Sequence, residues 1–369
     1  MVNASRMRDE FLELVRIDSL TLHERRMADV LKAKLEDMGI PAYEDDAGGK
    51  IGGNAGNLIC TVKGERNVPG ILLMAHMDTV SPGIGKNPVV EGDIIKTDGT
   101  TVLGGDDAAG IECILEALRV ISEDGIAHGN IYIAFTVAEE GGLLGAKNMD
   151  YSAIDAKYGF VMDDGGDIGS VAVSAPTQNK IDIIVKGKAA HAGVEPENGI
   201  SAVQIAAWAI SQMRLGRIDH ETTANIGTIK GGFATNIICD RVEIEAEARS
   251  RGRSKLKEQT SHMRHCFEMA CAKFGGSFEF DAQNVYPEFN IKDDSGIVGI
   301  LKRAAEKAGI ELRTGATGGG SDTNIINGRG IEAVDISVGM DKVHSVEEQI
   351  SIKDMARAAE FLVEIIKAV

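Results

Sequence analysis

The stretch Ile71-Leu72-Leu73-Met74-Ala75-His76-Met77-Asp78 decides the fold, because five apolar residues run directly into an imidazole and a carboxylate. Five consecutive apolar residues predict a short strand that is buried on both faces. Residues i and i+2 of a strand point the same way, so Asp78 can reach His76. A metal-binding histidine usually donates its other ring nitrogen to such a partner. We therefore expect a strand whose carboxyl end can hold a metal ion.

Helices and strands alternate on both sides of this strand. Apolar residues at helical spacing predict helices over residues 8–15, 26–38 and 109–120. Further strands are predicted over residues 131–137 and 159–162, and the first of these is apolar on both faces. Strands of this kind are typical of a largely parallel sheet covered by helices. The sequence therefore predicts an α/β catalytic domain.

The pattern changes after about residue 180. Residues 181–185 and 241–248 alternate apolar with polar side chains, which predicts strands with one solvated face. Two further strands and two helices complete a β-α-β-β-α-β order, the ferredoxin-like arrangement: strands 224–229 and 277–280, helices 201–213 and 254–274. We predict an inserted α+β domain over residues 179–286, inside a catalytic domain formed by residues 1–178 and 287–369.

Composition excludes several classes of function. The 369 residues carry a formal charge of −17 without a block of Lys or Arg, which argues against nucleic acid or an anionic membrane as partner. No apolar run is long enough to span a membrane, and the first ten residues are too charged for a signal peptide. We expect a cytoplasmic protein. Its five cysteines include no CxxC pair, and none is expected to act as a nucleophile.

Four further short segments outside the insert, near the ends of predicted strands or the start of a helix, carry acidic or imidazole side chains: Asp106-Asp107, Glu139-Glu140, Asp163-Asp164 and His344. Ligands bind at the carboxyl ends of strands in open α/β sheets, so we expect these segments to converge. Any single doublet would also suit a solvated helix N-terminus or turn. Several carboxylates in one cleft repel one another unless a cation lies among them, and a mixed set of histidines and carboxylates suits zinc.

Five motifs together resemble the M20 family of metallopeptidases. They are HMDTV at 76–80, LGGDDAAG at 103–110, AEEGG at 138–142, the strand ending at Asp163, and VHS at 343–345. IDAKYGFVMD at 154–163 and GGGSD at 318–322 resemble most the peptidase T branch of that family, the tripeptide aminopeptidases. The resemblance spans nearly the whole chain, the insert included.

The resemblance implies a co-catalytic site with two zinc ions per chain. His76 and Asp163 would bind one ion, Glu140 and His344 would bind the other, and Asp106 would bridge the two. Cobalt or manganese would accept the same ligands, so the sequence does not define the metal.

The resemblance also implies the residues that act on water. Glu139 would be the general base that takes a proton from a metal-bridging water, and Asp78 would orient His76. Neighbouring side chains in an extended chain point apart, so one doublet can supply both a ligand and a base. Asp107 and Asp164 remain alternative ligands within their doublets.

Three residues of the insert resemble substrate-binding positions of the family. His191, in GKAAHAG, would stabilise the oxyanion, often across a dimer, and Asn236 would donate to a peptide carbonyl. Arg249 could bind a terminal carboxylate with its planar fork. The alternatives are a histidine that faces water and an arginine paired with Glu247. The insert is expected to form a lid and the surface of a homodimer.

The predicted function is hydrolysis of short peptides, most specifically release of the N-terminal residue of tripeptides. One departure concerns specificity: tripeptide aminopeptidases tend to carry an arginine before the late glycines, where this chain has Thr317. An M20-type carboxypeptidase or an N-acyl amino acid amidohydrolase is the alternative, because both would use the same metal site. A catalytically silent peptide-binding protein is a further alternative, against which the retained Glu139 argues.

Overall fold

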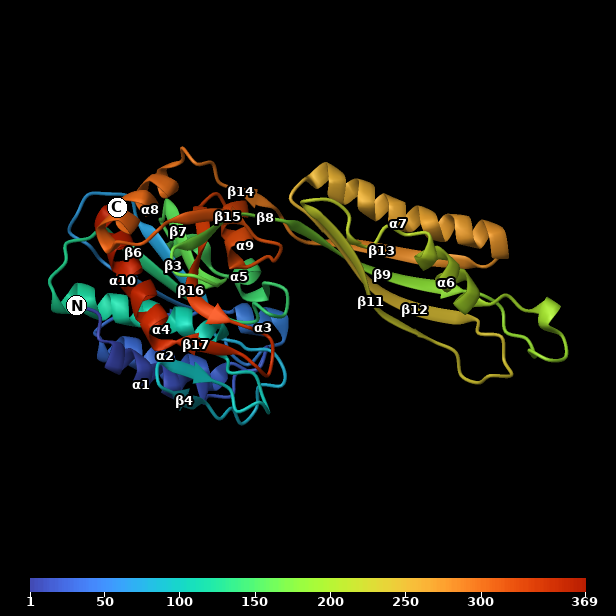
Figure 1. The fold of residues 1–369 in the computed structure, drawn as a ribbon, viewed down its shortest axis with the longest axis horizontal. Coiled ribbons are helices and arrows are strands. Elements are labelled where there is room, and N and C mark those ends of the chain that lie inside the picture. Colours follow the sequence, from blue (N-terminus) through green and yellow to red (C-terminus); the bar gives the residue numbers. More distant parts are fainter. The chain divides into compact units, whose positions relative to one another are not determined.

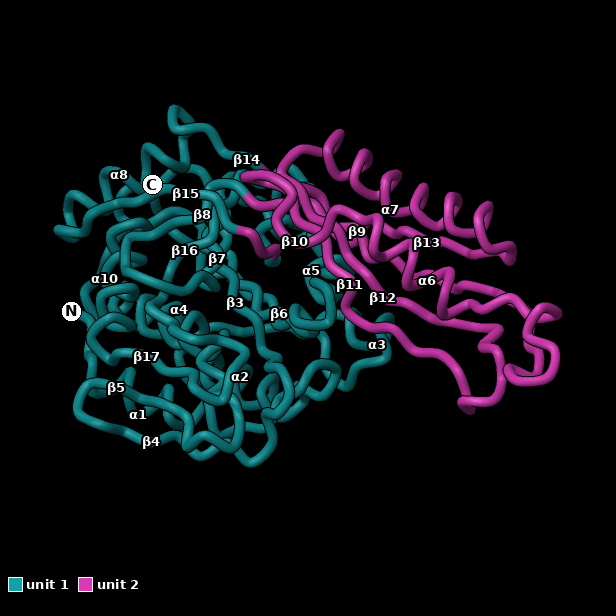
Figure 2. The backbone as a smooth tube through the Cα atoms, turned by 45° about the vertical axis from the view of Figure 1, so that its right-hand side comes forward, with its two compact units in different colours: residues 1–174, 290–317, 321–369 teal, residues 175–289, 318–320 magenta.

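The computed structural model describes residues 1–369 and contains two compact units (Figure 2). The first unit takes residues 1–174, 290–317 and 321–369, and the second takes 175–289 with 318–320. The predicted insert began at residue 179 and ended at 286, so the second unit is slightly longer at both ends. It also takes three glycines from the GGGSD motif.

A twelve-stranded sheet forms the centre of the first unit (Figure 1). Its middle has the order β6-β3-β7-β16, with β3 (Ile71–His76), β6 (Ile131–Thr136), β7 (Tyr158–Gly165) and β16 (Glu332–Asp341). Every neighbouring pair among these four strands is parallel. All residues of β3 and β6 are buried, as a run of apolar residues requires.

Most strand pairs at the margins of the sheet are antiparallel and one is parallel, so the prediction of a largely parallel sheet holds for its middle. The outer strands are β1 (Ala42–Glu44), β2 (Leu58–Val62), β4 (Val89–Glu91), β5 (Ile94–Lys96), β8 (Ser170–Ala175), β14 (Phe289–Asn290), β15 (Arg313–Ala316) and β17 (Gln349–Ser351). Only two residues connect β4 to β5, and so short a connection permits only an antiparallel pair.

Helix α4 (Gly105–Glu123) is the central helix of the first unit. It packs against β3 and β7, and α1 (Ala4–Val15) and α10 (Ile352–Ala368) lie beside it. The other helices of this unit are α2 (Arg25–Asp37), α3 (Ala47–Ile51), α5 (Leu144–Asn148), α8 (Gly296–Ala308) and α9 (Asp322–Gly328). The start of α4 is irregular, with non-helical φ/ψ at Asp106 and Asp107, and it places both residues beside His76 at the carboxyl end of β3.

The second unit has the predicted ferredoxin-like order. Its elements are β9 (Thr177–Lys186), α6 (Ala202–Ser211), the two-residue β10 (Gly216–Arg217), β11 (Thr222–Gly231), β12 (Arg241–Ser250), α7 (Arg253–Phe274) and β13 (Ser277–Tyr286). The sheet order is β10-β11-β12-β9-β13, and all pairs are antiparallel. Alternate residues of β12 are buried, which confirms one solvated face.

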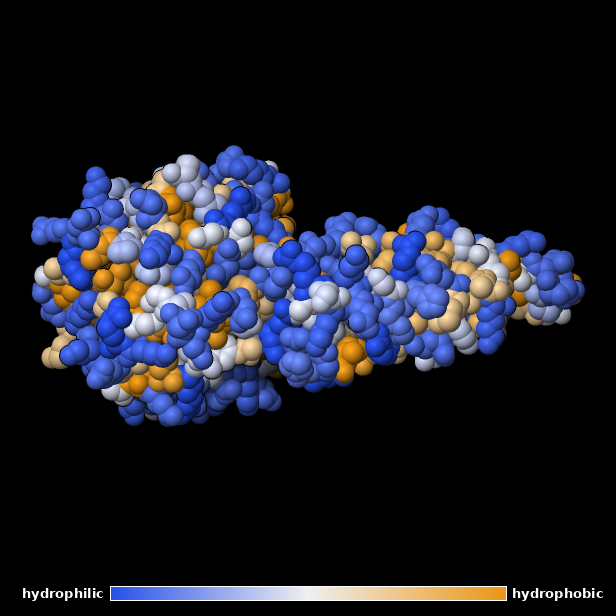
Figure 3. Space-filling view, turned by 90° about the horizontal axis from the view of Figure 1, so that it is seen from above, coloured by the Kyte–Doolittle hydropathy of each residue, from blue (hydrophilic) through white to orange (hydrophobic).

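The surface is mostly polar. In the view of Figure 3, apolar residues form separate groups among hydrophilic ones. Three large apolar side chains of the second unit are strongly exposed, namely Phe233 at 93%, Val194 at 74% and Ile229 at 52%. None of the helices combines the length and apolar character needed to cross a bilayer.

Candidate metal centre

The four parallel strands end at the same edge of the sheet, and the predicted residues follow those ends. His76 is the last residue of β3, and Asp163 lies near the end of β7. Glu139 and Glu140 follow β6, and His344 follows β16. Parallel neighbours bring their carboxyl ends together, which is why residues up to 268 positions apart, from His76 to His344, meet in one place.

Asp106 lies between the two histidines. Its Oδ1 is 2.9 Å from Nε2 of His76, and its Oδ2 is 3.1 Å from Nε2 of His344. Asp163 Oδ1 lies 3.5 Å from Nε2 of His76, whereas Glu140 Oε1 lies 2.6 Å from Nε2 of His344. One carboxylate thus faces the Nε2 atoms of both imidazoles, and each Nε2 atom has one further carboxylate of its own.

Glu139 belongs to the same cluster. Possible ligand atoms of His76, Glu139 and Asp163 lie within 4.8 Å of one another, and so do those of His76, Asp106 and Glu140. Glu139 makes no contact with His344 like that of Glu140, so the two neighbouring glutamates serve different parts of the cluster.

The electrostatics of the cluster suit cations. Burial raises the pKa of Glu139 and of Asp163 well above the ordinary range of carboxyl groups. Burial alone would lower the pKa of His76, but Asp163 and Asp106 outweigh it, and the pKa is raised. Hydrogen bonds to Asp106 and Glu140 raise the pKa of His344 to about 10. Two imidazoles among crowded carboxylates form a donor set that fits divalent metals such as zinc.

Asp78 supports the cluster in a way that the sequence did not predict. Nδ1 of His76 is 2.9 Å from the backbone carbonyl of Asp78 and 3.5 Å from its carboxylate. The carbonyl can only accept, so Nδ1 carries the hydrogen and Nε2 is left to face Asp106. The Asp78 carboxylate instead accepts the amides of Glu139 at 2.9 Å and Glu140 at 3.2 Å.

The alternative residues of two doublets turn away from the imidazoles. Asp107 accepts the backbone amides of His76 at 3.1 Å and Gly110 at 2.9 Å, so its carboxylate links the end of β3 to the start of α4. A Cβ at Gly110 would lie 2.3 Å from Asp107 Oδ1, so this contact needs a glycine. Asp164 follows Asp163 in a strand and points to the other face, where it accepts the amide of Gly165 at 3.0 Å.

Two buried glutamates near the centre were missed in the sequence. Glu24 Oε1 accepts the amides of Leu22 at 2.8 Å and Ala138 at 3.0 Å, and both residues have positive φ, 70° and 50°. It therefore holds the turn that carries Glu139. Glu348 contacts the loop that carries Asp106. Neither glutamate has a sequence signal, because the amides that link them to the centre, those of Ala138 and Asp106, are far away along the chain.

The three predicted substrate residues all lie in the second unit. His191 is exposed, and its Nδ1 accepts the amides of Gly193 and Val194, each at 3.1 Å. Asn236 is also exposed. Arg249 makes two contacts of 3.0 Å with Glu247, so the structure has the paired arrangement that the sequence left as the alternative. Their roles toward a substrate stay predictions.

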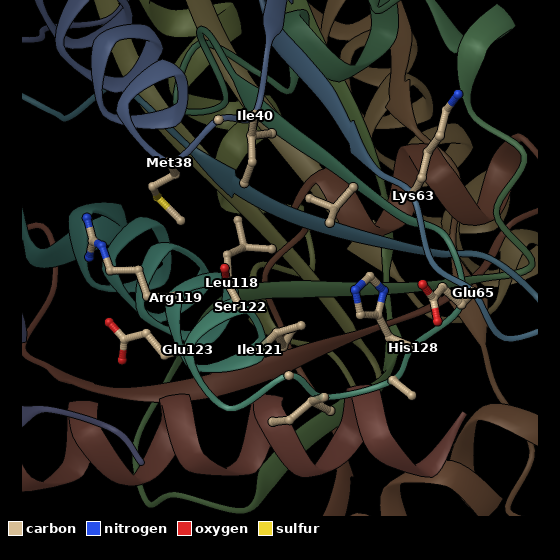
Figure 4. A pocket seen from close by; sticks show the side chains of 15 residues that line it. Met38, Ile40, Lys63, Glu65, Leu118, Arg119, Ile121, Ser122, Glu123 and His128 are labelled. Atoms are coloured by element: carbon tan, nitrogen blue, oxygen red, sulfur yellow. The ribbon is translucent and has the colours of Figure 1, made fainter.

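A cavity of about 590 Å³ lies elsewhere in the first unit (Figure 4). Lys63, Glu65 and His128 line one side of it, and Arg119 and Glu123 line the other. The regular part of α4 follows Asp107, and from Ala108 to Arg119 the helix rises about 17 Å at 1.5 Å per residue. The cavity therefore belongs to the opposite end of α4 and contains none of the candidate ligands.

Comparison with known proteins gives consistent results. The model of peptidase family M20/M25/M40 matches residues 72–368. The uncharacterized protein YqjE of Bacillus subtilis is 49% identical over 100% of this chain and 99% of its own. The crystal structure of aminopeptidase PepT from Bacillus cereus has 46% identity and a TM-score of 0.91, covering 100% of this chain and 99% of that one. A tripeptidase structure from Staphylococcus aureus has 43% identity and a TM-score of 0.96, covering 100% and 98%.

Proposed function

The chain belongs to peptidase family M20/M25/M40, and from this premise we propose that it is a metallo-aminopeptidase that releases the N-terminal residue of short peptides, tripeptides above all. One observation carries the proposal: the Asp106 carboxylate faces the Nε2 atoms of both His76 and His344. The similar proteins named aminopeptidase PepT and tripeptidase support the N-terminal specificity.

We propose that the cluster holds two metal ions, zinc in the first instance. His76 and Asp163 would hold one ion, Glu140 and His344 the other, and Asp106 both, because the contacts of the five side chains divide in this way. Two ions at these positions would acidify the attacking water and balance the charge that develops on the scissile carbonyl oxygen.

Glu139 is the proposed general base. Its side chain is buried, with 8% of the residue exposed, and its backbone amide is held by Asp78 at 2.9 Å. A base in this position takes the proton from the attacking water and returns it to the leaving amine.

The second unit is proposed to act as lid and dimer surface. Its exposed Phe233, Val194 and Ile229 are apolar groups of the kind that a second subunit would cover. His191 would stabilise the oxyanion and Asn236 would bind a peptide carbonyl. Arg249 could bind a substrate carboxylate only by exchanging its contacts with Glu247.

A substrate panel tests the proposal. Purified protein loaded with zinc, cobalt or manganese is assayed on a tripeptide, the matching dipeptide, the N-acetylated tripeptide and N-acetyl amino acids. We expect release of the N-terminal residue from the free tripeptide and no cleavage once its amine is acetylated. The Glu139→Ala variant, purified in parallel, measures contaminating peptidases.

The same panel separates the alternatives. Release of the C-terminal residue would identify a carboxypeptidase. Cleavage of N-acetyl amino acids alone would identify an amidohydrolase. Tight binding of the tripeptide without turnover under all three metals would identify a binding protein. Each of these results would overturn the aminopeptidase proposal.

A further inference from the structure

Glu348 lies four residues after His344 and is almost completely buried, with 1% of the residue exposed. A buried carboxylate is costly unless hydrogen bonds satisfy it. Its partners are therefore informative, and all of them lie in the segment that carries Asp106.

Three backbone amides donate to the Glu348 carboxylate. Oε2 accepts Leu103 at 2.7 Å and Gly104 at 3.0 Å, and Oε1 accepts Asp106 at 3.0 Å. The third of these amides belongs to the residue whose side chain faces both histidines. Glu348 thus holds the backbone of Asp106 directly.

The two glycines before Asp106 shape this contact. Gly104 has φ +74°, a conformation that side chains other than glycine rarely adopt. A Cβ at Gly105 would lie 3.0 Å from Glu348 Oε1, closer than carbon and oxygen normally approach. The Leu103-Gly104-Gly105-Asp106 segment therefore wraps closely around the carboxylate.

The backbone of Glu348 has separate partners. Its carbonyl accepts the amide of Thr97 at 3.2 Å, and its amide donates to Ser345 at 3.2 Å. The next residue begins β17, which pairs with β5 and β16. These backbone bonds hold the chain after His344 and do not involve the Glu348 side chain. The Glu348 carboxylate therefore adds a link between the His344 segment and Asp106.

We propose that Glu348 is a positioning residue that fixes Asp106 relative to His344 and thereby sets the affinity of the centre for the metal ion on the His344 side. His344 needs such support because it lies on a turn, with φ +60° and half of its side chain exposed. The inference rests on the proposed two-metal site.

Metal titration tests the inference without using activity. Metal-free wild type and the variants Glu348→Gln and Glu348→Asp are titrated with Zn²⁺ and Mn²⁺ by calorimetry. Titration with Co²⁺, followed by visible absorption, reports the coordination of each ion. The amide of glutamine would direct hydrogens at backbone donors, and aspartate is too short to reach all three amides. We expect one of the two ions to bind 10–100-fold more weakly in both variants and the other ion to be little changed.

Glu347→Gln is the matched control. Glu347 neighbours Glu348 but is exposed and pairs with Lys342 at 3.0 Å. It should bind both ions as the wild type does. Circular dichroism and the melting temperature establish that each variant is folded before titration.

The outcomes are distinct. Two ions bound by folded Glu348 variants with wild-type affinity would overturn the inference and leave the proposed function standing. Equal weakening of both ions, or a variant that does not fold even in saturating Mn²⁺, would show that the carboxylate serves the fold in general and would also overturn it. A wild type that binds no metal would overturn the proposed function itself.

Discussion

The two histidines face the same carboxylate from different surroundings. The His76 side chain is 2% exposed, lies in the middle of the sheet between β6 and β7, and has its Nδ1 held by the Asp78 carbonyl. The His344 side chain is 50% exposed and lies on a turn after β16. We call the His76 side, with Asp163 and Glu139, the sheet half, and the His344 side, with Glu140, the loop half.

This difference teaches how such a centre is built. In the sheet half the candidate ligand His76 ends a strand that is buried on both faces, and hydrogen bonds to Asp78 and Asp107 add to the strand packing. The histidine of the loop half lies on a turn instead of a strand, and in our proposal the Glu348 carboxylate supports this half by accepting the backbone amide of Asp106. We therefore expect the ion of the sheet half to bind more tightly and the ion of the loop half to exchange faster.

The largest expected effect separates the adjacent glutamates. Glu139→Gln should lower kcat by about 10²–10⁴-fold, since a general base contributes about that much, while both ions stay bound. Glu140→Gln should instead lose the ion of the loop half. Steady-state kinetics on a tripeptide, combined with metal analysis of the same samples, checks both. Loss of metal in the first variant would mean that Glu139 is a ligand.

Replacing His76 and replacing His344 should lower the free energy of unfolding by different amounts. His76→Ala leaves buried carboxylates without their partner and should lower the free energy of unfolding of the metal-free protein by about 3 kcal/mol or more. His344→Ala removes a half-exposed partner and should cost about 1 kcal/mol or less. Denaturant unfolding measures both. Equal losses would show that the two surroundings do not differ in energy.

Glu24 gives the sheet half a pH dependence of stability. Burial raises the pKa of its carboxyl group from 4.5 to about 7. Between these pH values only the folded state keeps the proton, so stability falls as pH rises. At 1.4 kcal/mol per pKa unit, the full loss is about 3 kcal/mol. Glu24→Gln should remove this part of the slope between pH 4.5 and 7.5 in denaturant unfolding, and an unchanged slope would contradict the assignment.

Metal-dependent stabilisation should occur in two steps. A ligand at 100 times its Kd stabilises a folded protein by about 2.7 kcal/mol. Thermal melting of metal-free protein against rising Mn²⁺ should show one step at low concentration, from the sheet half, and a second at higher concentration. His344→Ala should retain only the first step, and a single step in the wild type would mean that the halves bind as one.

The sequence analysis predicted the strands of the sheet half from local information. The run from Ile71 to Ala75 indicated burial on both faces, and the structure and the family match confirm the α/β fold and the resemblance. The pattern of 241–248 likewise predicted β12 and its solvated face. Short outer strands such as β4, β5 and β17 were missed, since three residues carry too little pattern to detect.

The supporting contacts could not be predicted from sequence, because each joins distant parts of the chain. Glu24 and Ala138 are 114 residues apart, and Glu348 and Asp106 are 242 apart. The carboxylates of Glu24 and Glu348 accept hydrogen bonds from backbone amides. Every residue except proline carries such an amide, so no sequence motif marks the partner.

The sequence by itself determined which side chains stand at the strand ends, because alternation, burial and strand length are properties of a few neighbouring residues. Only the tertiary structure decided which partner each carboxylate faces. Asp106 faces both histidines, Asp107 accepts the amide of His76, and the Asp78 carboxylate accepts the amides of two glutamates. The physical reason is that a carboxylate is oriented by the donors that surround it, and the chain assembles those donors only when it folds.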